Sequence, residues 1–294
     1  MGKAWDLVGL TTLGGLGFLG ALRREAPPAI SLRLEGYRCV VTGGNGGLGA
    51  AVAYGLAQAG AEEVVLACRS GERCEEALKE LYQRCVAEMG VRRCRELQRK
   101  WACRLLDLTS GRSIRSFVKE TKGKRPTILV NNAGVMADGR HVKDLQMRTN
   151  HYGHFLLTQL LLPSMEPSSL IVMVASRAHH QGTLDPEHPD KDTWLDRLGL
   201  GWYGRYARSK LCNVLMCSQL RRAFPEGPHC TAVSPGLVAT ELFRAVPRPL
   251  GPALRLLAGG FQEPEEAAKH VLRAVAAATE GEVPLSLDQI RVNG

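Results

Sequence analysis

The sequence has few aromatic residues and no closely spaced pair of cysteines. Phe, Trp and Tyr together make up 5% of its 294 residues, and none of the nine cysteines stands in a CxxC pair. An odd number of scattered cysteines in a chain of this length is typical of reduced intracellular thiols. We therefore expect reduced cysteines that serve as packing residues: Cys39, Cys68, Cys74, Cys85, Cys94, Cys103, Cys212, Cys217 and Cys230.

A set of metal ligands is lacking as well. Two pairs of histidines are candidate metal ligands, His151 with His154 and His179 with His180. No carboxylate or cysteine completes a ligand set at a suitable spacing around either pair. We expect no metal site.

An apolar run near the N-terminus, Leu7–Leu22, is free of charge but short. It contains five glycines, whereas a membrane-spanning helix needs about 20 mostly apolar residues. The sequence has no small-residue cleavage pattern, and the start MGKAWD lacks the sixth-position Ser or Thr of a myristoylation signal. The run predicts either a membrane anchor or an apolar leader packed on the domain that follows. If it inserts, Arg23 and Arg24 keep the rest of the chain in the cytosol.

Positive charge exceeds negative charge, with a formal net charge of +9. Much of the excess lies between Arg84 and Arg104. Such a run is typical of a solvated helix face. It would also suit an anionic membrane surface, where each basic residue contributes about 1 kcal/mol. No aromatic interleaving or recognition motif accompanies the charge, so we expect no nucleic-acid partner.

Short apolar runs alternate with amphipathic stretches from Tyr37 onward. The pattern predicts strands at 39–41, 63–67, 103–106, 128–130 and 170–174, and helices at 50–59, from 72, at 113–120 and at 145–162. Such alternation is typical of an α/β protein with a doubly wound parallel sheet, the Rossmann fold. We predict a short apolar leader at 1–35 and a single domain at 36–294.

A glycine-rich loop follows the first predicted strand directly and opens the first helix. Glycines there let the backbone turn sharply and approach a pyrophosphate, which the free N–H groups of the helix N-terminus attract. Its position between strand and helix makes the loop a candidate dinucleotide site. The candidate cofactor-binding residues are Thr42, Gly43, Asn45, Gly47, Leu48 and Gly49.

The residue after the second strand bears on the choice of cofactor. Many NAD sites place Asp or Glu near this point for the ribose 2′-hydroxyl, whereas Arg accommodates a 2′-phosphate. Arg69 stands here and predicts NADP(H). Asp107, with Leu108 beside it, ends the third strand, where its carboxylate could accept a hydrogen bond from the adenine amino group.

A candidate proton-transfer group follows from a spacing of four. Tyr206 and Lys210 share one face of a helix. A nearby ammonium lowers the pKa of a phenol, which then serves as general acid or base. Ser176 ends the fifth strand, where its hydroxyl would contact the reacting oxygen. Asn150 offers an amide suited to holding a water that links Lys210 to solvent.

Together these motifs resemble the short-chain dehydrogenase/reductase family, over about Gly36 to Ala277. The matching motifs are Thr42-Gly43-x-x-x-Gly47-x-Gly49, Asn131-Asn132-Ala133-Gly134, Asn150, Ser176, Tyr206-x-x-x-Lys210 and Ser234-Pro235-Gly236. The resemblance implies a seven-stranded Rossmann sheet and a catalytic tetrad of Asn150, Ser176, Tyr206 and Lys210. It also implies that Lys210 binds the nicotinamide ribose and that Thr240 touches the carboxamide. Cofactor contacts are further implied for Asn132, Ala133, Gly134, Tyr206, Pro235 and Gly236.

Several segments are similar to the retinol dehydrogenase-like branch of that family: ACRS, NHYGHFLLTQLLL, ASRAHH and YARSKLCNVL. The long Ser176-to-Tyr206 insertion also fits this branch. Two features depart from the family: Ala175 precedes Ser176, where many relatives have a second serine, and the tail after Gly281 does not resemble the usual last strand. The segment 241–260, rich in Leu and Pro, would supply an apolar lid.

The expected activity is NADP(H)-dependent hydride transfer to or from a lipophilic carbonyl or alcohol, retinal-like or steroid-like. Alternatives are small polar carbonyls as substrates, or a cofactor-binding scaffold at a membrane surface without turnover. Expected partners are a lipophilic substrate, a membrane surface and a second copy of the chain in a homodimer. The expected location is the endoplasmic reticulum or lipid droplet membrane, with the catalytic domain facing the cytosol, or alternatively the cytoplasm.

Overall fold

A computed structural model describes residues 31–121, 127–136, 145–185, 187–188, 195, 200–236, 238 and 262–281. Four features singled out in the sequence lie outside the described residues. They are the apolar run Leu7–Leu22, Thr240, the leucine-rich segment 241–260 and the tail after Gly281.

Six parallel strands form one sheet in the order β3-β2-β1-β4-β5-β6. The strands are β1 (Arg38–Thr42), β2 (Glu63–Cys68), β3 (Trp101–Leu105), β4 (Ile128–Asn131), β5 (Leu170–Val174) and β6 (His229–Val233). The order reverses between β1 and β4, which pair in register from Cys39 with Ile128 to Val41 with Val130. Ligands of such sheets bind at the carboxyl ends of the strands, where the order reverses. The doubly wound parallel sheet is confirmed, with six strands among the described residues.

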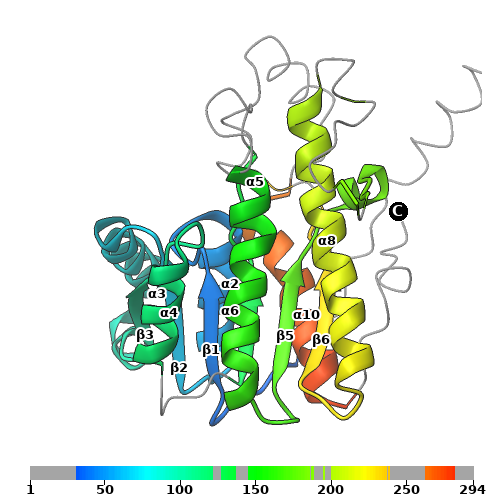
Figure 1. Ribbon diagram of the computed structural model, residues 1–294. Coiled ribbons are helices and arrows are strands. Elements are labelled where there is room, and N and C mark those ends of the chain that lie inside the picture. Colours follow the sequence, from blue (N-terminus) through cyan, green and yellow to red (C-terminus); the bar gives the residue numbers. More distant parts are fainter. Residues whose placement is uncertain are drawn as a thin grey trace, which may run out of the picture.

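Helices cover both faces of this sheet (Figure 1). One layer contains α2 (Gly47–Gln58), α3 (Gly71–Gln98) and α10 (Pro264–Thr279), and the other contains α4 (Gly111–Glu120), α6 (Gly153–Leu161) and α8 (Gly201–Ala223). Alternate side chains of β1 divide between them: Cys39 and Val41 pack with the first layer, and Val40 packs with the second. Each central strand therefore lies between two apolar layers.

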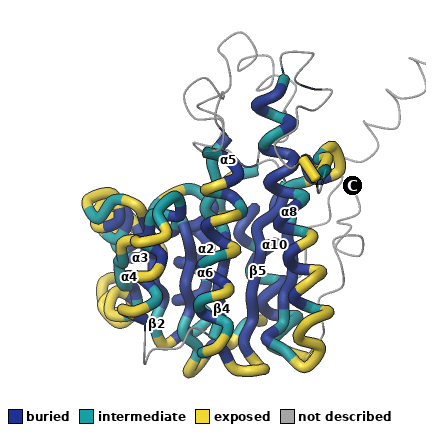
Figure 2. The backbone as a smooth tube through the Cα atoms, viewed as in Figure 1, coloured by how far each residue is buried: buried dark blue, intermediate teal, exposed yellow. Residues whose placement is uncertain are grey.

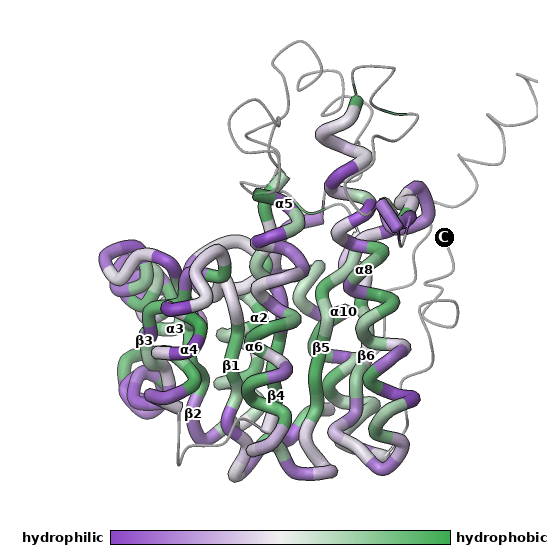
Figure 3. Tube along the Cα trace, viewed as in Figure 1, coloured by the Kyte–Doolittle hydropathy of each residue, from purple (hydrophilic) through white to green (hydrophobic). Residues whose placement is uncertain are grey.

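Burial and hydropathy follow this three-layer arrangement. The strands other than β3 are mostly buried, while the outer helix faces and many loops are exposed (Figure 2). The apolar residues run along the strands and the polar residues gather on the loops (Figure 3). In β5, every residue of the charge-free run Leu170–Val174 is buried, as a central parallel strand requires.

The helix predicted at 145–162 is not continuous. It consists of α5 (Leu145–Met147), a π-helical turn at Arg148–Tyr152, α6, and a 3₁₀ turn at Leu162–Ser164. The carbonyl of Asn150, inside the π turn, accepts hydrogen bonds from His154 Nδ1 at 3.0 Å and Asn213 Nδ2 at 3.0 Å. Single π turns in helices are frequent at functional sites.

The expectation that all cysteines are reduced is wrong for four of them. Disulfides join Cys74 to Cys103 and Cys85 to Cys94, across 29 and 9 residues. The first ties α3 to β3. The second spans Gly90, whose φ of 77° interrupts α3 and lets the chain change direction there. The remaining cysteines are unpaired and buried, as expected of packing residues: Cys39, Cys68, Cys212, Cys217 and Cys230.

The basic run in α3 is largely solvated. Arg92, Arg93 and Arg95 are exposed, and Arg93 pairs with Glu96 at 3.5 Å. Arg84 contacts Glu88 at 2.8 Å and also pairs with Glu265 on α10. Exposed pairs of this kind contribute little to stability. In the part of the chain that the structure describes, no helix combines the length and apolarity needed to cross a membrane.

Candidate active site

The glycine-rich loop turns between β1 and α2 at the carboxyl edge of the sheet. Gly43 and Gly47 have φ of 64° and 50°, values that glycine adopts without strain. Gly49 packs so closely that an added Cβ would lie 2.2 Å from the Gly43 carbonyl oxygen. The N-cap residue of α2 is Gly46, which has no side chain, so no side-chain hydrogen bond caps the first turn. That helix end is therefore available to an anionic group.

This loop forms one wall of a cavity of about 850 Å³. That volume lies within the range of small-molecule and cofactor sites. Most predicted cofactor and catalytic residues line it: Gly43, Asn45, Gly47, Leu48, Gly49, Arg69, Asp107, Leu108, Asn132, Ala133, Gly134, Ser176, Tyr206, Lys210, Pro235 and Gly236. The cavity thus brings together motifs that are far apart in the sequence.

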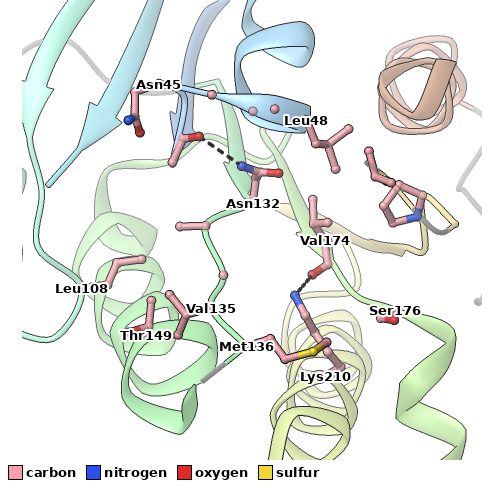
Figure 4. Close-up of a pocket in the computed structure, with 18 of the residues that line it drawn as sticks. Asn45, Leu48, Leu108, Asn132, Val135, Met136, Thr149, Val174, Ser176 and Lys210 are labelled. Carbon is pink, nitrogen blue, oxygen red and sulfur yellow. Dashed lines mark hydrogen bonds between the residues drawn. The ribbon is translucent and has the colours of Figure 1, made fainter. Parts of the chain in front are cut away.

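The role of Thr42 differs from the prediction. It is not among the cavity-lining residues, and it supports the glycine-rich loop from within the protein. Its side chain is fully buried, and Oγ1 accepts hydrogen bonds from the N–H groups of Asn132 and Ala133, each at 2.9 Å. In return, Asn132 Nδ2 donates to the Thr42 carbonyl at 2.8 Å and also contacts the Gly43 carbonyl at 3.5 Å, the contact drawn in Figure 4. These bonds fasten the end of β4 to the end of β1.

At one end of the cavity, β2 and β3 present charged side chains. Arg69 is exposed and lines the cavity directly after β2. One oxygen of Asp107, Oδ1, accepts from the N–H and hydroxyl of Thr109 at 2.9 and 2.7 Å. Arg73 lines the same end, although sequence reasoning missed it. It stands near the start of α3, where its N–H donates to Ser70 Oγ at 3.3 Å.

At the other end, β5 and α8 bring three candidate catalytic side chains together. Ser176 lies two residues after the end of β5, and Tyr206 and Lys210 lie one turn apart on α8. Lys210 Nζ donates to the Val174 carbonyl at 2.8 Å, the contact drawn in Figure 4, and stands 5.7 Å from the centre of the Tyr206 ring. Ser176 is within hydrogen-bonding reach of Tyr206. The arrangement can hold a carbonyl oxygen between two hydroxyl groups.

The acidity of these groups differs from the simple expectation that Lys210 lowers the pKa of Tyr206. Burial raises the pKa of Tyr206 to about 12, against the opposing effect of the hydrogen bond with Ser176. Burial also lowers the pKa of Lys210 to about 8. The Lys210 ammonium is directed to the Val174 carbonyl, and desolvation of the phenol dominates. Tyr206 is therefore a protonated phenol at neutral pH.

Asn150 also differs in its contacts from the prediction. It is fully buried and is not among the cavity-lining residues. Its Oδ1 accepts from the Val135 N–H at 2.8 Å, and Nδ2 donates to the Val135 carbonyl at 3.0 Å and to Ser209 Oγ at 3.0 Å. The amide predicted to hold a water thus holds the backbone after β4, beside Gly134.

The side chains of Asn150 and Lys210 both lie close to Gly134. A Cβ at Gly134 would lie 3.6 Å from Asn150 Oδ1 and 3.7 Å from Lys210 Nζ. Sequence reasoning did not single out several further lining residues: Met136, Thr149, Arg177, Gln181, Tyr203 and Val238. Only Arg177 and Gln181 carried a signal, since they follow Ser176 within one short segment.

The lining residues fit a nicotinamide dinucleotide. The glycines leave space for a pyrophosphate: a Cβ at Gly46 would meet nothing within 4 Å. Arg69 and Arg73 supply positive charge at one end, beside the carboxylates of Glu76 and Glu80, and the hydroxyl groups and ammonium lie at the other. Among the described residues there is no group of three His, Cys, Asp or Glu side chains that could hold a metal ion.

Comparisons with known proteins agree with this geometry. A family model described as short chain dehydrogenase matches residues 38–185. Dehydrogenase/reductase SDR family member 13 of Bos taurus is 41% identical over 260 residues, which cover 82% of this chain and 64% of that protein. Retinol dehydrogenase 14 of Homo sapiens is 35% identical over 267 residues, covering 82% and 75% respectively.

A solved structure shares the fold at lower sequence identity. A blue fluorescent protein from a metagenomic library, in complex with NADPH, has a TM-score of 0.63 and 22% identity, covering 86% of this chain and 95% of that one. The chain spans just under two thirds of the bovine relative, 64% of its length. The matched family model and the identities to these relatives place the chain in the short-chain dehydrogenase/reductase family of oxidoreductases, in its retinol dehydrogenase-like branch.

Proposed function

We propose that the protein is an NADP(H)-dependent oxidoreductase of lipophilic carbonyl compounds and alcohols. The observation that carries the proposal is one shared cavity. Ser176, Tyr206 and Lys210 line it at one end, and Arg69 and the glycine-rich loop line it at the other. A scaffold that only binds cofactor would not need a buried phenol and ammonium beside the same cavity.

Each part of the cofactor has candidate partners in this chain. The loop from Gly43 to Gly49 would hold the pyrophosphate, and Arg69 with Arg73 would hold a 2′-phosphate. Asp107 would accept from the adenine amino group, and Lys210 would contact the nicotinamide ribose. Further contacts would come from the family positions Leu108, Asn132, Ala133, Gly134, Pro235, Gly236 and Thr240. When bound, the nicotinamide supplies or accepts the hydride at the reacting carbon.

The chain itself supplies the proton and the orientation. In reduction, the Tyr206 hydroxyl donates its proton to the carbonyl oxygen as the carbon gains a hydride, which yields the alcohol. Ser176 Oγ donates a hydrogen bond to the same oxygen and orients it. The high pKa of Tyr206 keeps the phenol protonated before the step. The positive charge of Lys210, 5.7 Å from the centre of the ring, would offset part of the desolvation cost of the phenolate that forms.

Two observations bear on the class of substrate. Met136, Val135 and Tyr203 provide an apolar lining, and the names of several relatives refer to retinol. Both support a lipophilic substrate. Arg177 and Gln181, which are exposed and line the same cavity, instead favour a small polar carbonyl. This alternative has the same proton donor and differs only in what surrounds the reacting carbon.

A graded panel of carbonyl compounds tests the proposal. Aldehydes of increasing chain length are measured with NADPH at a fixed protein concentration, beside small polar ketones. We expect kcat/KM to rise with apolar chain length, because each buried methylene contributes about 0.8 kcal/mol. In Tyr206→Phe, turnover should fall by about 10² to 10⁴ while the ring still packs. Unchanged turnover in Tyr206→Phe would refute the assigned proton donor.

Location and assembly belong to the same proposal. We propose association with an intracellular membrane through the segment before Pro27, with the catalytic domain on the cytosolic side, and the cytoplasm as the alternative. Assembly as a homodimer is also proposed. Sedimentation velocity of the purified protein decides the assembly, and a monomer at assay concentrations would exclude a stable dimer.

A further inference from the structure

A buried histidine connects the glycine-rich loop with the candidate tetrad. His154, on α6, is fully buried and is not among the cavity-lining residues. Its Nε2 lies 2.8 Å from Thr42 Oγ1, and its Nδ1 lies 3.0 Å from the Asn150 carbonyl oxygen. Thr42 is the last residue of β1, and Asn150 is in the π-helical turn. One imidazole therefore spans the gap between two functional segments.

The contacts of His154 fix its tautomer. A carbonyl oxygen only accepts hydrogen bonds, so Nδ1 carries the proton and donates to Asn150. Nε2 is then the acceptor, and the Thr42 hydroxyl donates to it at 2.8 Å in preference to the Val130 carbonyl, which lies 3.4 Å away. Burial lowers the pKa of His154 to about 3, with a smaller contribution from the positive charge of Lys210. The imidazole is thus neutral at neutral pH and has one hydrogen-bonding arrangement.

The network continues on the side of the cofactor loop. Because Thr42 gives its proton to His154, its oxygen remains an acceptor for the N–H groups of Asn132 and Ala133, each at 2.9 Å. Both of these residues line the cavity, and Gly43 follows Thr42 directly. The orientation of the Thr42 hydroxyl therefore supports one wall of the cofactor site.

On the catalytic side, the network reaches α8 through Asn150. The Asn150 amide holds the backbone of Val135, and its Nδ2 also donates to Ser209 Oγ at 3.0 Å. Ser209 in turn donates to the Tyr206 carbonyl at 2.7 Å and immediately precedes Lys210. A rotation of the Asn150 side chain would therefore change the hydrogen bonds of α8, the helix that carries Tyr206 and Lys210.

We infer that His154 is a positioning residue for the proposed reaction: it fixes the distance between the cofactor loop and the tetrad by holding Thr42 and Asn150 at once. The inference rests on the proposed function. The competing interpretation is a satisfied core histidine that contributes stability alone. A positioning residue predicts that loss of the Thr42 contact changes cofactor affinity and loss of the Asn150 contact changes turnover. A core histidine predicts that either loss changes stability alone.

Two substitutions by amide side chains remove one contact each. In His154→Asn, the amide nitrogen takes the place of Nδ1 and can still donate to Asn150, while the Thr42 hydroxyl loses its nearer acceptor and keeps only the Val130 carbonyl at 3.4 Å. In His154→Gln, the amide reaches the place of Nε2 and can still accept from Thr42, while the Asn150 carbonyl loses its donor. Thr158→Val is the matched control, because Thr158 is equally buried on α6 and bonds to Asn131.

The readouts are NADPH affinity by fluorescence titration, kcat and its pH profile, and the thermal midpoint. We expect His154→Asn to raise the Kd for NADPH by about tenfold with a smaller change in kcat, the effect of one lost buried hydrogen bond. We expect His154→Gln to lower kcat by about tenfold and shift its pH profile, with Kd nearly unchanged. Thr158→Val should lower the thermal midpoint without either effect.

Wild-type Kd, kcat and pH profile in both variants, with only the midpoint lowered, would overturn the inference. If the wild-type protein binds NADPH but turns over no carbonyl compound, the proposed function fails while the effect of His154→Asn on Kd still decides the cofactor side of the inference. If a His154 variant does not fold, Thr42→Ser and Thr42→Val replace it. Serine should keep the Kd of the wild type and valine should raise it, and equal Kd values would contradict a role for the hydroxyl.

Discussion

The charge of Arg69 should decide between NADPH and NADH. Arg69 is exposed and lines the cavity directly after β2, with Arg73 nearby on α3. Hydrogen bonds to charged groups contribute about 1.5 to 3 kcal/mol, and solvent exposure favours the lower value. Loss of Arg69 should therefore cost about tenfold in NADPH affinity. Because an introduced carboxylate also repels the 2′-phosphate, Arg69→Asp should lower that affinity by roughly 10- to 100-fold.

The assay is a pair of fluorescence titrations, with NADPH and with NADH, for each variant. NADH lacks the 2′-phosphate, so its Kd should change by less than about threefold. Arg92→Asp is the matched control, because it makes the same change in net charge at an exposed residue of α3 that is not among the cavity-lining residues. Arg73→Ala should reduce NADPH affinity further in the Arg69→Asp background. Equal losses for both cofactors would refute the assignment of Arg69 to a 2′-phosphate.

Further predictions concern pH, disulfides and the leader. The lowered pKa of Lys210, about 8, means that the unfolded chain binds more protons between about pH 8 and its usual value near 10.4. The free energy of unfolding of the cofactor-free protein should therefore rise by up to about 3 kcal/mol across that window, and urea titrations should find no such rise from this group in Lys210→Met. Replacing Cys74 and Cys103 by alanine should lower the free energy of unfolding by about 3 to 4 kcal/mol, given their sequence separation of 29, and reductant should lower that of the wild type by at least as much; insensitivity to reductant would mean that the thiols are not paired. Deleting residues 1–26 should release a membrane-pelleting protein into the supernatant, a result that cannot occur if the full chain is already soluble without detergent.

The strand pattern and most of the cavity could be predicted because parallel sheets place function at strand ends. Residues directly after an apolar run, such as Arg69, Asp107 and Ser176, must lie at the carboxyl edge, whatever the side chains do. The pair Tyr206 and Lys210 followed from helical spacing together with the position of Ser176 after the fifth strand. For these residues the backbone position sets the location of the side chain.

The direction of a side chain was harder to predict. Thr42 and Asn150 lie in the expected motifs, yet both point into the protein and bind backbone groups. Which way each points depends on partners distant in sequence, Asn132 for the first and Ser209 for the second. Sequence spacing contains no information about such pairs, and the π-helical turn at Asn150 adds to the difficulty.

The disulfides were missed for a similar reason. Cys74 and Cys103 are 29 residues apart and meet only because α3 packs on β3, with Cα atoms 6.0 Å apart. Cys85 and Cys94 meet because the chain turns at Gly90. An odd total of cysteines favoured free thiols, and the count is consistent with two pairs and five remaining thiols.

The unpaired cysteines can serve as probes of local opening in the folded protein, because all five are buried thiols. Burial raises the pKa of the Cys39 thiol, in β1, and of the Cys230 thiol, in β6, so neither is a reactive thiolate in the native state. An alkylating reagent can modify them only when the surrounding layer opens. The modification rate at each position therefore measures the free energy of a local opening, at a central strand for Cys39 and at the outermost described strand for Cys230. A faster rate at Cys230 than at Cys39 would show that β6 opens more readily than β1.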